Sequence, residues 1–152
     1  MRGLEIRGWR LEKGDSEMPD DIRQTLIARA MAARARAYAP YSNYRVGAAL
    51  LADSGTIYDG VNVENAVYPV GLCAERTALV KAVSEGERRF EAIAVATHNG
   101  GSPCGMCRQM LSEFGLDLKV FLVDGAGVVV HETTLRDLLP RAFGPADLKD
   151  EG

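Results

Sequence analysis

Apolar and polar positions follow two different periods along the chain, and the period separates expected helices from expected strands. From Asp20 to Ala39 strong helix formers dominate, and apolar side chains recur at helical spacing. These apolar positions are Ile22, Leu26, Ile27, Ala30 and Met31. Asp20 and Asp21 favour a helix start, and Pro40 favours an end because the residue before a proline avoids helical geometry. The pattern therefore predicts a first helix over 20–39.

Short apolar runs bounded by turn residues predict strands in the rest of the chain. The expected strands are 46–52, 56–64, 90–98, 118–124 and 127–133, the first two forming a hairpin. Helices are expected over 73–86 and 105–115, with a short closing helix over 135–143. This alternation predicts an α/β domain of three layers around a mixed sheet. We expect residues 20–152 to form this single domain and residues 1–19 to be a flexible extension outside its core.

Composition narrows the class of protein and of partner. The 152 residues are 47% hydrophobic and 26% charged, as in one ordinary globular domain. The net charge of −3 weighs against nucleic acid or an anionic membrane as the main partner, and we interpret the local Arg29, Arg34 and Arg36 as a solvated helix face. The sequence shows neither an apolar run long enough to span a membrane nor the apolar block of a signal peptide. The expected location is the cytoplasm.

Three cysteines carry the first chemical signal. An odd number of cysteines without a secretion signal argues against structural disulfides. Cys104 and Cys107 form a Cys-x-x-Cys pair at an expected helix start, and Cys73 stands at another. Helix starts favour thiolates, and Cys-x-x-Cys spacing suits a metal ion. Since one strand lies between the two segments, parallel-type packing would bring both helix starts to one edge of the sheet.

The number of ligands decides what such a metal does. Structural zinc is normally closed by four protein ligands, whereas catalytic zinc has three and an open position. His98 could complete a closed Cys3His site, so the cysteines alone leave both readings open. Glu75, two residues after Cys73, favours catalysis because a carboxylate there can take a proton from water and return it to a substrate. Its alternative role is to stabilise the helix dipole. Arg76 can donate hydrogen bonds to the thiolates, or simply form a surface ion pair.

The sequence resembles the small cytidine deaminases from Pro40 onward. The matching stretches are PYSNYRVGAALL, GVNVENAVY with CAERTALVKAVSEG, SPCGMCRQMLSEFG and LLPRAFGPADL. The combination of C-A-E with P-C-x-x-C is specific to such enzymes. The resemblance implies the cytidine deaminase-like fold with a five-stranded mixed sheet, and Zn2+ held by Cys73, Cys104 and Cys107. It implies hydrolytic deamination of cytidine and deoxycytidine, in which Glu75 protonates N3, water attacks C4 and ammonia leaves. Pyrimidine salvage and a homotetramer with shared active sites are further expectations.

Two polar residues indicate where a sugar would bind. Asn62 and Glu64 are two apart on the strand expected over 56–64, so both should project from one face while Val61 and Val63 face the other way. An amide beside a carboxylate suits a ribose hydroxyl, which is the role that the resemblance assigns to this pair. The alternative is an ordinary polar strand face.

The resemblance also assigns aromatic and amide side chains to the substrate. Tyr44 stands where the family carries an aromatic residue, often phenylalanine, that packs on the pyrimidine, and its hydroxyl needs a partner. Tyr68 and Phe143 match residues that line a neighbouring subunit's pocket, although plain core packing is the alternative. Gln109 looks like a group that supports the metal centre or contacts the base. Val67, where many relatives have serine, leaves the substrate preference open.

Three other functions compete with this one. Enzymes that act on nucleoside antibiotics such as blasticidin S share the cysteine motifs, but residues 62–66 and 138–143 fit cytidine deaminases better. Deaminases that edit nucleic acid usually have histidine as the first ligand and favour a basic groove, whereas this acidic chain has Cys73. A zinc-stabilised binding module without activity would have His98 on the metal.

Overall fold

The computed structural model describes residues 17–149 and contains the expected helices and strands in the expected order. The elements are α1 (Asp20–Arg34), β1 (Gly47–Ala52), β2 (Ile57–Val61), η1 (Tyr68–Val70), α2 (Ala74–Ser84), β3 (Phe90–Ala96), α3 (Gly105–Ser112), β4 (Lys119–Val123), β5 (Val129–Thr134), α4 (Leu135–Leu138) and η2 (Pro145–Leu148). None of the helices within this described part is long and apolar enough to cross a membrane.

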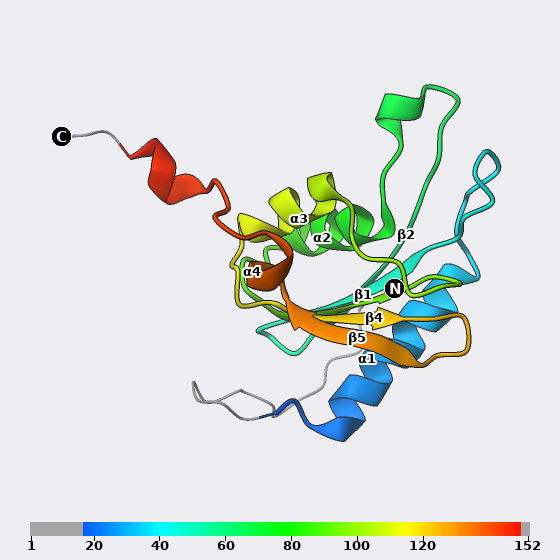
Figure 1. Ribbon diagram of the computed structural model, residues 1–152, viewed down its shortest axis with the longest axis horizontal. Helices are drawn as coiled ribbons and strands as arrows, with labels where there is room; N and C mark the ends of the chain where they lie inside the picture. Colours follow the sequence, from blue (N-terminus) through cyan, green and yellow to red (C-terminus); the bar gives the residue numbers. More distant parts are fainter. Residues whose placement is uncertain (1–16, 150–152) are drawn as a thin grey trace.

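The strands form one mixed five-stranded sheet in the order β2-β1-β3-β4-β5. β1 pairs antiparallel with β2 and β3, β3 pairs parallel with β4, and β5 closes the sheet antiparallel to β4. α1 covers one face of the sheet, and α2 and α3 cover the other (Figure 1). The predicted three-layer α/β/α architecture is therefore confirmed.

Two apolar cores explain why both faces of the sheet are covered. All six residues of β1 are buried, and successive side chains of a strand point to opposite faces. Ala48 and Leu50 pack in the core under α2 and α3, whereas Ala49 and Leu51 pack in the core under α1. The α1 core also contains Met18, which is buried just before the helix. Residues 1–16 of the expected extension lie outside the described residues.

Two glycines let the helices approach the sheet closely. A Cβ on Gly47 would lie 2.2 Å from the carbonyl oxygen of Ala30 in α1, and a Cβ on Gly60 would lie 2.2 Å from that of Ala74 in α2. Any larger residue would therefore push the helix off the strand. Gly60 matters for the site because it lets the first turn of α2, which follows Cys73, lie close against β2.

The expected element ends are wrong where tertiary pairing intervenes. The first helix ends at Arg34 rather than Ala39, because the following segment pairs with the chain beyond β2: Tyr38 N–H donates to the Asn62 carbonyl at 3.0 Å, and Glu64 N–H donates to the Tyr38 carbonyl at 2.9 Å. The strand expected over 56–64 stops at Val61 for the same reason. The closing helix stops at Leu138, since Pro140 follows and Arg141 has a positive φ of 56°.

Candidate active site

The three cysteines meet at the adjacent starts of two helices, as expected. Cys73 occupies the N-cap position of α2, Cys104 occupies that of α3, and Cys107 lies buried in the first turn of α3. The Sγ atoms of Cys73 and Cys104 are 3.8 Å apart, and those of Cys104 and Cys107 are 3.5 Å apart. Tetrahedral zinc with Zn–S bonds of about 2.3 Å places its sulfurs about 3.8 Å apart. The thiol cluster therefore fits zinc in both donor type and spacing.

His98 is placed away from this cluster. Its side chain is exposed, and its ring packs edge-to-face on Tyr44 with 5.0 Å between the ring centroids. Within residues 17–149, the group of side chains close enough to share a metal consists of the three cysteines. The closed Cys3His site that the cysteines alone left open is therefore not formed, and a three-thiolate centre has room for one more ligand.

Neighbouring groups favour the thiolate form of Cys73. A hydrogen bond from Cys107, followed by one from Arg76, lowers the pKa of the Cys73 thiol to about 5. Arg76 Nη2 lies 3.8 Å from Cys73 Sγ and also donates to the Gly71 carbonyl at 3.3 Å. The guanidinium thus lies where it can offset the negative charge of the sulfurs, which is the role predicted for Arg76.

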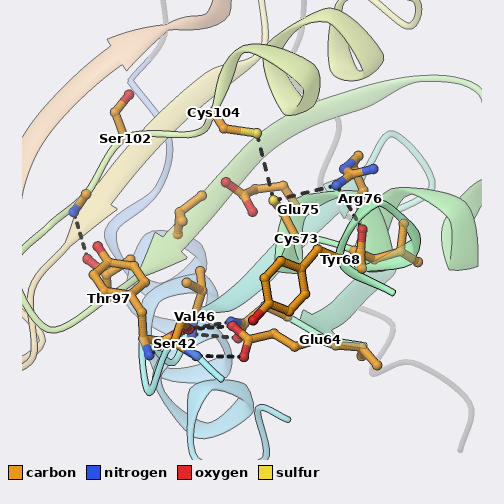
Figure 2. Close-up of a pocket in the computed structure, with 17 residues that line it drawn as sticks. Ser42, Val46, Glu64, Tyr68, Cys73, Glu75, Arg76, Thr97, Ser102 and Cys104 are labelled. Carbon is orange, nitrogen blue, oxygen red and sulfur yellow. Dashed lines mark hydrogen bonds between the residues drawn. The ribbon is translucent and has the colours of Figure 1, made fainter. Parts of the chain in front are cut away.

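Glu75 is a buried carboxyl beside the thiols. It lies in the first turn of α2, its side chain is only 4% exposed, and it forms part of a pocket wall (Figure 2). Burial raises the pKa of Glu75 to about 7, and the negative charge of Cys73 adds to the increase. A solvated carboxylate that merely stabilises a helix dipole would be exposed. The position instead suits a group that exchanges a proton with a bound molecule.

The pocket in front of Glu75 has the size of a small-molecule site, at about 450 Å³. Cys73, Cys104 and Arg76 lie at one end, and Ser42 and Glu64 lie at the other (Figure 2). The pocket is therefore polar at both ends, with a metal-binding end and a carboxylate end.

Glu64 is held as a charged acceptor at its end of the pocket. Its carboxylate accepts hydrogen bonds from the backbone N–H of Tyr41 at 2.9 Å and of Ser42 at 3.0 Å, and from the Ser42 hydroxyl. The bond from the Ser42 hydroxyl is the main cause of the lowered pKa of Glu64. The carboxylate is thus ionised and fixed in orientation before any ligand arrives.

Asn62 is buried and shapes the same wall. Its Oδ1 accepts from Val46 N–H at 2.9 Å, and its Nδ2 donates to the Tyr44 carbonyl at 2.7 Å. Asn62 and Glu64 both line the pocket, but the strand argument for this was wrong. Both residues lie beyond the end of β2, and Val63, which was expected to face the other way, lines the pocket too.

The remaining predicted residues divide into two groups. Tyr44 and Tyr68 line the pocket, and Tyr68 is 74% exposed on the η1 turn, which projects from the body of the molecule (Figure 1). Phe143 and Gln109 do not line this chain's pocket. Gln109 Nε2 donates to the Phe143 carbonyl at 2.9 Å, and the Phe143 side chain is 57% exposed.

Several pocket residues were missed from the sequence. Ser42, Val46, Thr97, Gly101 and Ser102 line the pocket but were not singled out. The Ser42–Asn43 turn, in which Asn43 has a positive φ of 56°, was a usable signal, because polar turn residues often hydrogen-bond nearby groups. Thr97 follows β3 directly, at the carboxyl edge where ligands of α/β sheets usually bind.

Comparison with known proteins decides the family. The family model for the cytidine and deoxycytidylate deaminase zinc-binding region matches residues 20–123. The chain belongs to this deaminase family. It is 51% identical to the cytidine deaminase of Sporosarcina psychrophila, over 82% of this chain and 93% of that protein. It is 49% identical to the cytidine deaminase of Halalkalibacterium halodurans, over 84% of this chain and 98% of the relative.

Solved structures agree with the family assignment. The crystal structure of cytidine deaminase from Burkholderia pseudomallei is 50% identical, with a TM-score of 0.74 over 78% of this chain and 97% of that chain. The cytidine deaminase of Mycobacterium tuberculosis is 41% identical, with a TM-score of 0.71 over 80% of this chain and 97% of the other. The range matched by the deaminase family model includes all three cysteines and Glu75.

Proposed function

We propose that this chain catalyses the zinc-dependent hydrolytic deamination of cytidine and deoxycytidine to uridine and deoxyuridine, with release of ammonia. The observation that carries the proposal is the buried Glu75 carboxyl next to three thiols spaced for zinc, at the inner end of a nucleoside-sized pocket. Membership of the family and the curated cytidine deaminases at 43–51% identity support the choice of cytosine as the base.

Cys73, Cys104 and Cys107 would hold the zinc ion, which when bound supplies the Lewis-acid chemistry that makes water nucleophilic near neutral pH. The protein's own part is proton transfer. Glu75 takes a proton from the attacking water and gives it to N3 of the cytosine ring. It then takes the proton of the new C4 hydroxyl group and gives it to the amino group, so that the C4–N bond breaks, the C4 carbonyl forms and ammonia leaves. Arg76 offsets the charge of the thiolates, and the apolar walls limit water around Glu75.

At the other end of the pocket, the nucleoside sugar is bound by Glu64 and Asn62. Glu64 is already oriented by three hydrogen bonds, and its free lone pairs can accept from a sugar hydroxyl. Asn62 retains one unused N–H of its amide and holds the segment that presents Tyr44. The Tyr44 ring is proposed to pack against the pyrimidine.

A direct assay tests this function. Purified zinc-loaded protein is incubated with cytidine and with deoxycytidine, and ultraviolet absorbance and ammonia are followed together. Stoichiometric conversion to the uracil nucleoside with release of ammonia is expected. The absence of both changes at confirmed zinc occupancy would overturn the proposal. Single-stranded DNA that contains cytosine or 5-methylcytosine serves as the comparison substrate, and no turnover of it is expected.

We further propose that the enzyme is a homotetramer whose subunits share active sites, with Phe143 reaching a neighbour's pocket and Gln109 supporting the segment that carries it. The supporting features are the exposed Phe143, a carboxyl-terminal segment that runs away from the body (Figure 1), and the exposed Tyr68 at the rim of the pocket. The tetramer predicts a mass of four chains by light scattering, and a stable monomer would contradict it.

Mixing two inactive variants tests the sharing of sites. Glu75→Gln removes the proton carrier, and Phe143→Ala removes the side chain that would reach the neighbour. Subunits mixed by mild dissociation and reassociation should form some sites that contain both an intact Glu75 and an intact Phe143. Activity above the sum of the two separate variants is expected. Activity equal to that sum would show that each chain supplies its own site.

We also propose a cytoplasmic role in pyrimidine salvage, tested by growth of a pyrimidine auxotroph on cytidine.

A further inference from the structure

The Tyr44 hydroxyl joins two loops that both line the pocket. Tyr44 Oη donates to Asn99 Oδ1 at 2.7 Å, and Asn99 Oδ1 also accepts from the Thr97 hydroxyl at 3.3 Å. The Thr97 hydroxyl in turn accepts from Gly101 N–H at 2.7 Å. Thr97 is 2% exposed, so this chain of hydrogen bonds is anchored on a buried side chain. It connects the loop before β1 to the 97–101 loop that leads to Cys104.

The same hydroxyl occupies the space of a side chain at position 101. A Cβ built on Gly101 would lie 2.5 Å from Tyr44 Oη, and its next nearest atoms are 3.6 Å away on Asn99 and Thr97. Gly101 is not among the glycines with positive φ, so its backbone conformation does not itself require glycine. The space taken by the Tyr44 hydroxyl is therefore the main reason why a side chain does not fit here.

Tyr44 has little freedom to move aside. Its N–H donates to the Ser42 hydroxyl at 3.0 Å, its carbonyl accepts from Asn62 at 2.7 Å, and its ring packs on His98. With the backbone held on both sides, a displaced hydroxyl must rotate the ring, and the ring forms part of the pocket wall. A collision at position 101 would therefore be transmitted to whatever packs on Tyr44.

We propose that Tyr44, Asn99 and Gly101 form a lock that sets the position of the Tyr44 ring in the substrate pocket, with the hydroxyl both tethering the ring and excluding any side chain from position 101. Asn99 and Gly101 are thus positioning residues for nucleoside binding, outside the metal centre. The lock rests on the proposed function in so far as its effect is measured on cytidine.

A double-mutant cycle tests the lock. Wild type, Tyr44→Phe, Gly101→Ala and the double variant are compared for KM and kcat on cytidine and for Tm. Gly101→Ala alone should raise KM at least about fivefold, because overpacking rotates the ring, and should change kcat less than about twofold. In the Tyr44→Phe background, the same change should alter KM less than about twofold, since the colliding oxygen is gone. An equal increase in both backgrounds would overturn the lock, and so would no increase in either.

A second cycle covers the case in which Gly101→Ala does not fold. Asn99→Ala removes the acceptor without adding atoms, and should raise KM about two- to tenfold with Tyr44 present but not with Tyr44→Phe. An equal increase in KM from Asn99→Ala with Tyr44 and with Tyr44→Phe would contradict the role of the hydroxyl as a tether. The Tm values test the lock without any catalysis. The changes in Tm caused by Tyr44→Phe and Gly101→Ala should not add up to the change in the double variant, even if cytidine is not turned over. Inactive wild type would thus defeat the proposed function, whereas additive Tm values would defeat the lock.

Discussion

Replacing Glu64 with glutamine should separate the charge of this residue from its structural role. The substituted side chain keeps the shape of the original: its amide oxygen can accept the two N–H bonds from Tyr41 and Ser42, and its amide nitrogen can donate to the Ser42 hydroxyl. The protein should therefore remain folded, with a Tm within about 2 °C of wild type. What Glu64→Gln removes is an ionised acceptor at the sugar end of the pocket, which the lowered pKa of Glu64 keeps charged near neutral pH.

The expected loss follows from the kind of bond that is removed. Hydrogen bonds to charged groups are about twice as strong as neutral ones, so Glu64→Gln should lower kcat/KM for cytidine about tenfold to a hundredfold. On 2′,3′-dideoxycytidine, which lacks both sugar hydroxyls that the carboxylate could accept from, the same substitution should cost less than about threefold. The assay is steady-state kinetics on both substrates with both proteins. An equal loss on the two substrates would refute the assignment of Glu64 to a sugar hydroxyl.

Three further predictions test the fold, the titration of a buried group and the metal. Gly60→Ala should destabilise the protein by about 1–3 kcal/mol and lower its zinc affinity, because its Cβ would meet the Ala74 carbonyl at 2.2 Å in the first turn of α2. Gly144→Ala, with no atom within 4 Å of the added Cβ, is the control and should leave Tm within about 1 °C, so an equal Tm loss in both would contradict the packing argument. Burial, with Glu87 nearby, raises the pKa of Tyr58 to about 12 from 10.0, so the stability present below pH 10.0 is lost as pH rises toward 12. In Tyr58→Phe, the free energy of unfolding measured with denaturant should fall less steeply between pH 9 and 12 than in wild type. The same pH dependence in both proteins would contradict the prediction. Removal of zinc with a chelator should lower Tm reversibly, with recovery on adding zinc, and a Tm independent of zinc would argue against a metal centre.

Features that depend on residues close together in the sequence could be predicted from it. The cysteines could be assigned to helix starts because each precedes a run of helix formers, and β1 was visible as an uninterrupted apolar run. The meeting of the two helix starts was expected because one strand lies between the two cysteine segments, so that parallel-type packing would bring both starts to one edge of the sheet. Glu75 was singled out by its spacing from Cys73 together with the three cysteines, and the structure shows this carboxyl to be buried.

Long-range pairing was invisible in the sequence. Residues 35–39 read as helix because alanines and arginines are good helix formers, yet Tyr38 pairs with the chain beyond β2. The same pairing ends β2 at Val61, and it changes how Glu64 reaches the pocket. Ser42 could not be recognised as the partner of Glu64, since the bond spans 22 residues and depends on that pairing. The partner of the Tyr44 hydroxyl, 55 residues away at Asn99, was equally out of reach.

The most direct test of the central claim is the turnover of cytidine by wild type and by Glu75→Gln at equal zinc content. The substitution keeps the size of the buried side chain but removes its ability to carry a proton, so both proteins should bind zinc and unfold at similar temperatures. The account predicts rapid release of ammonia by wild type and a kcat at least about a hundredfold lower for Glu75→Gln. Equal turnover by the two zinc-loaded proteins would contradict it.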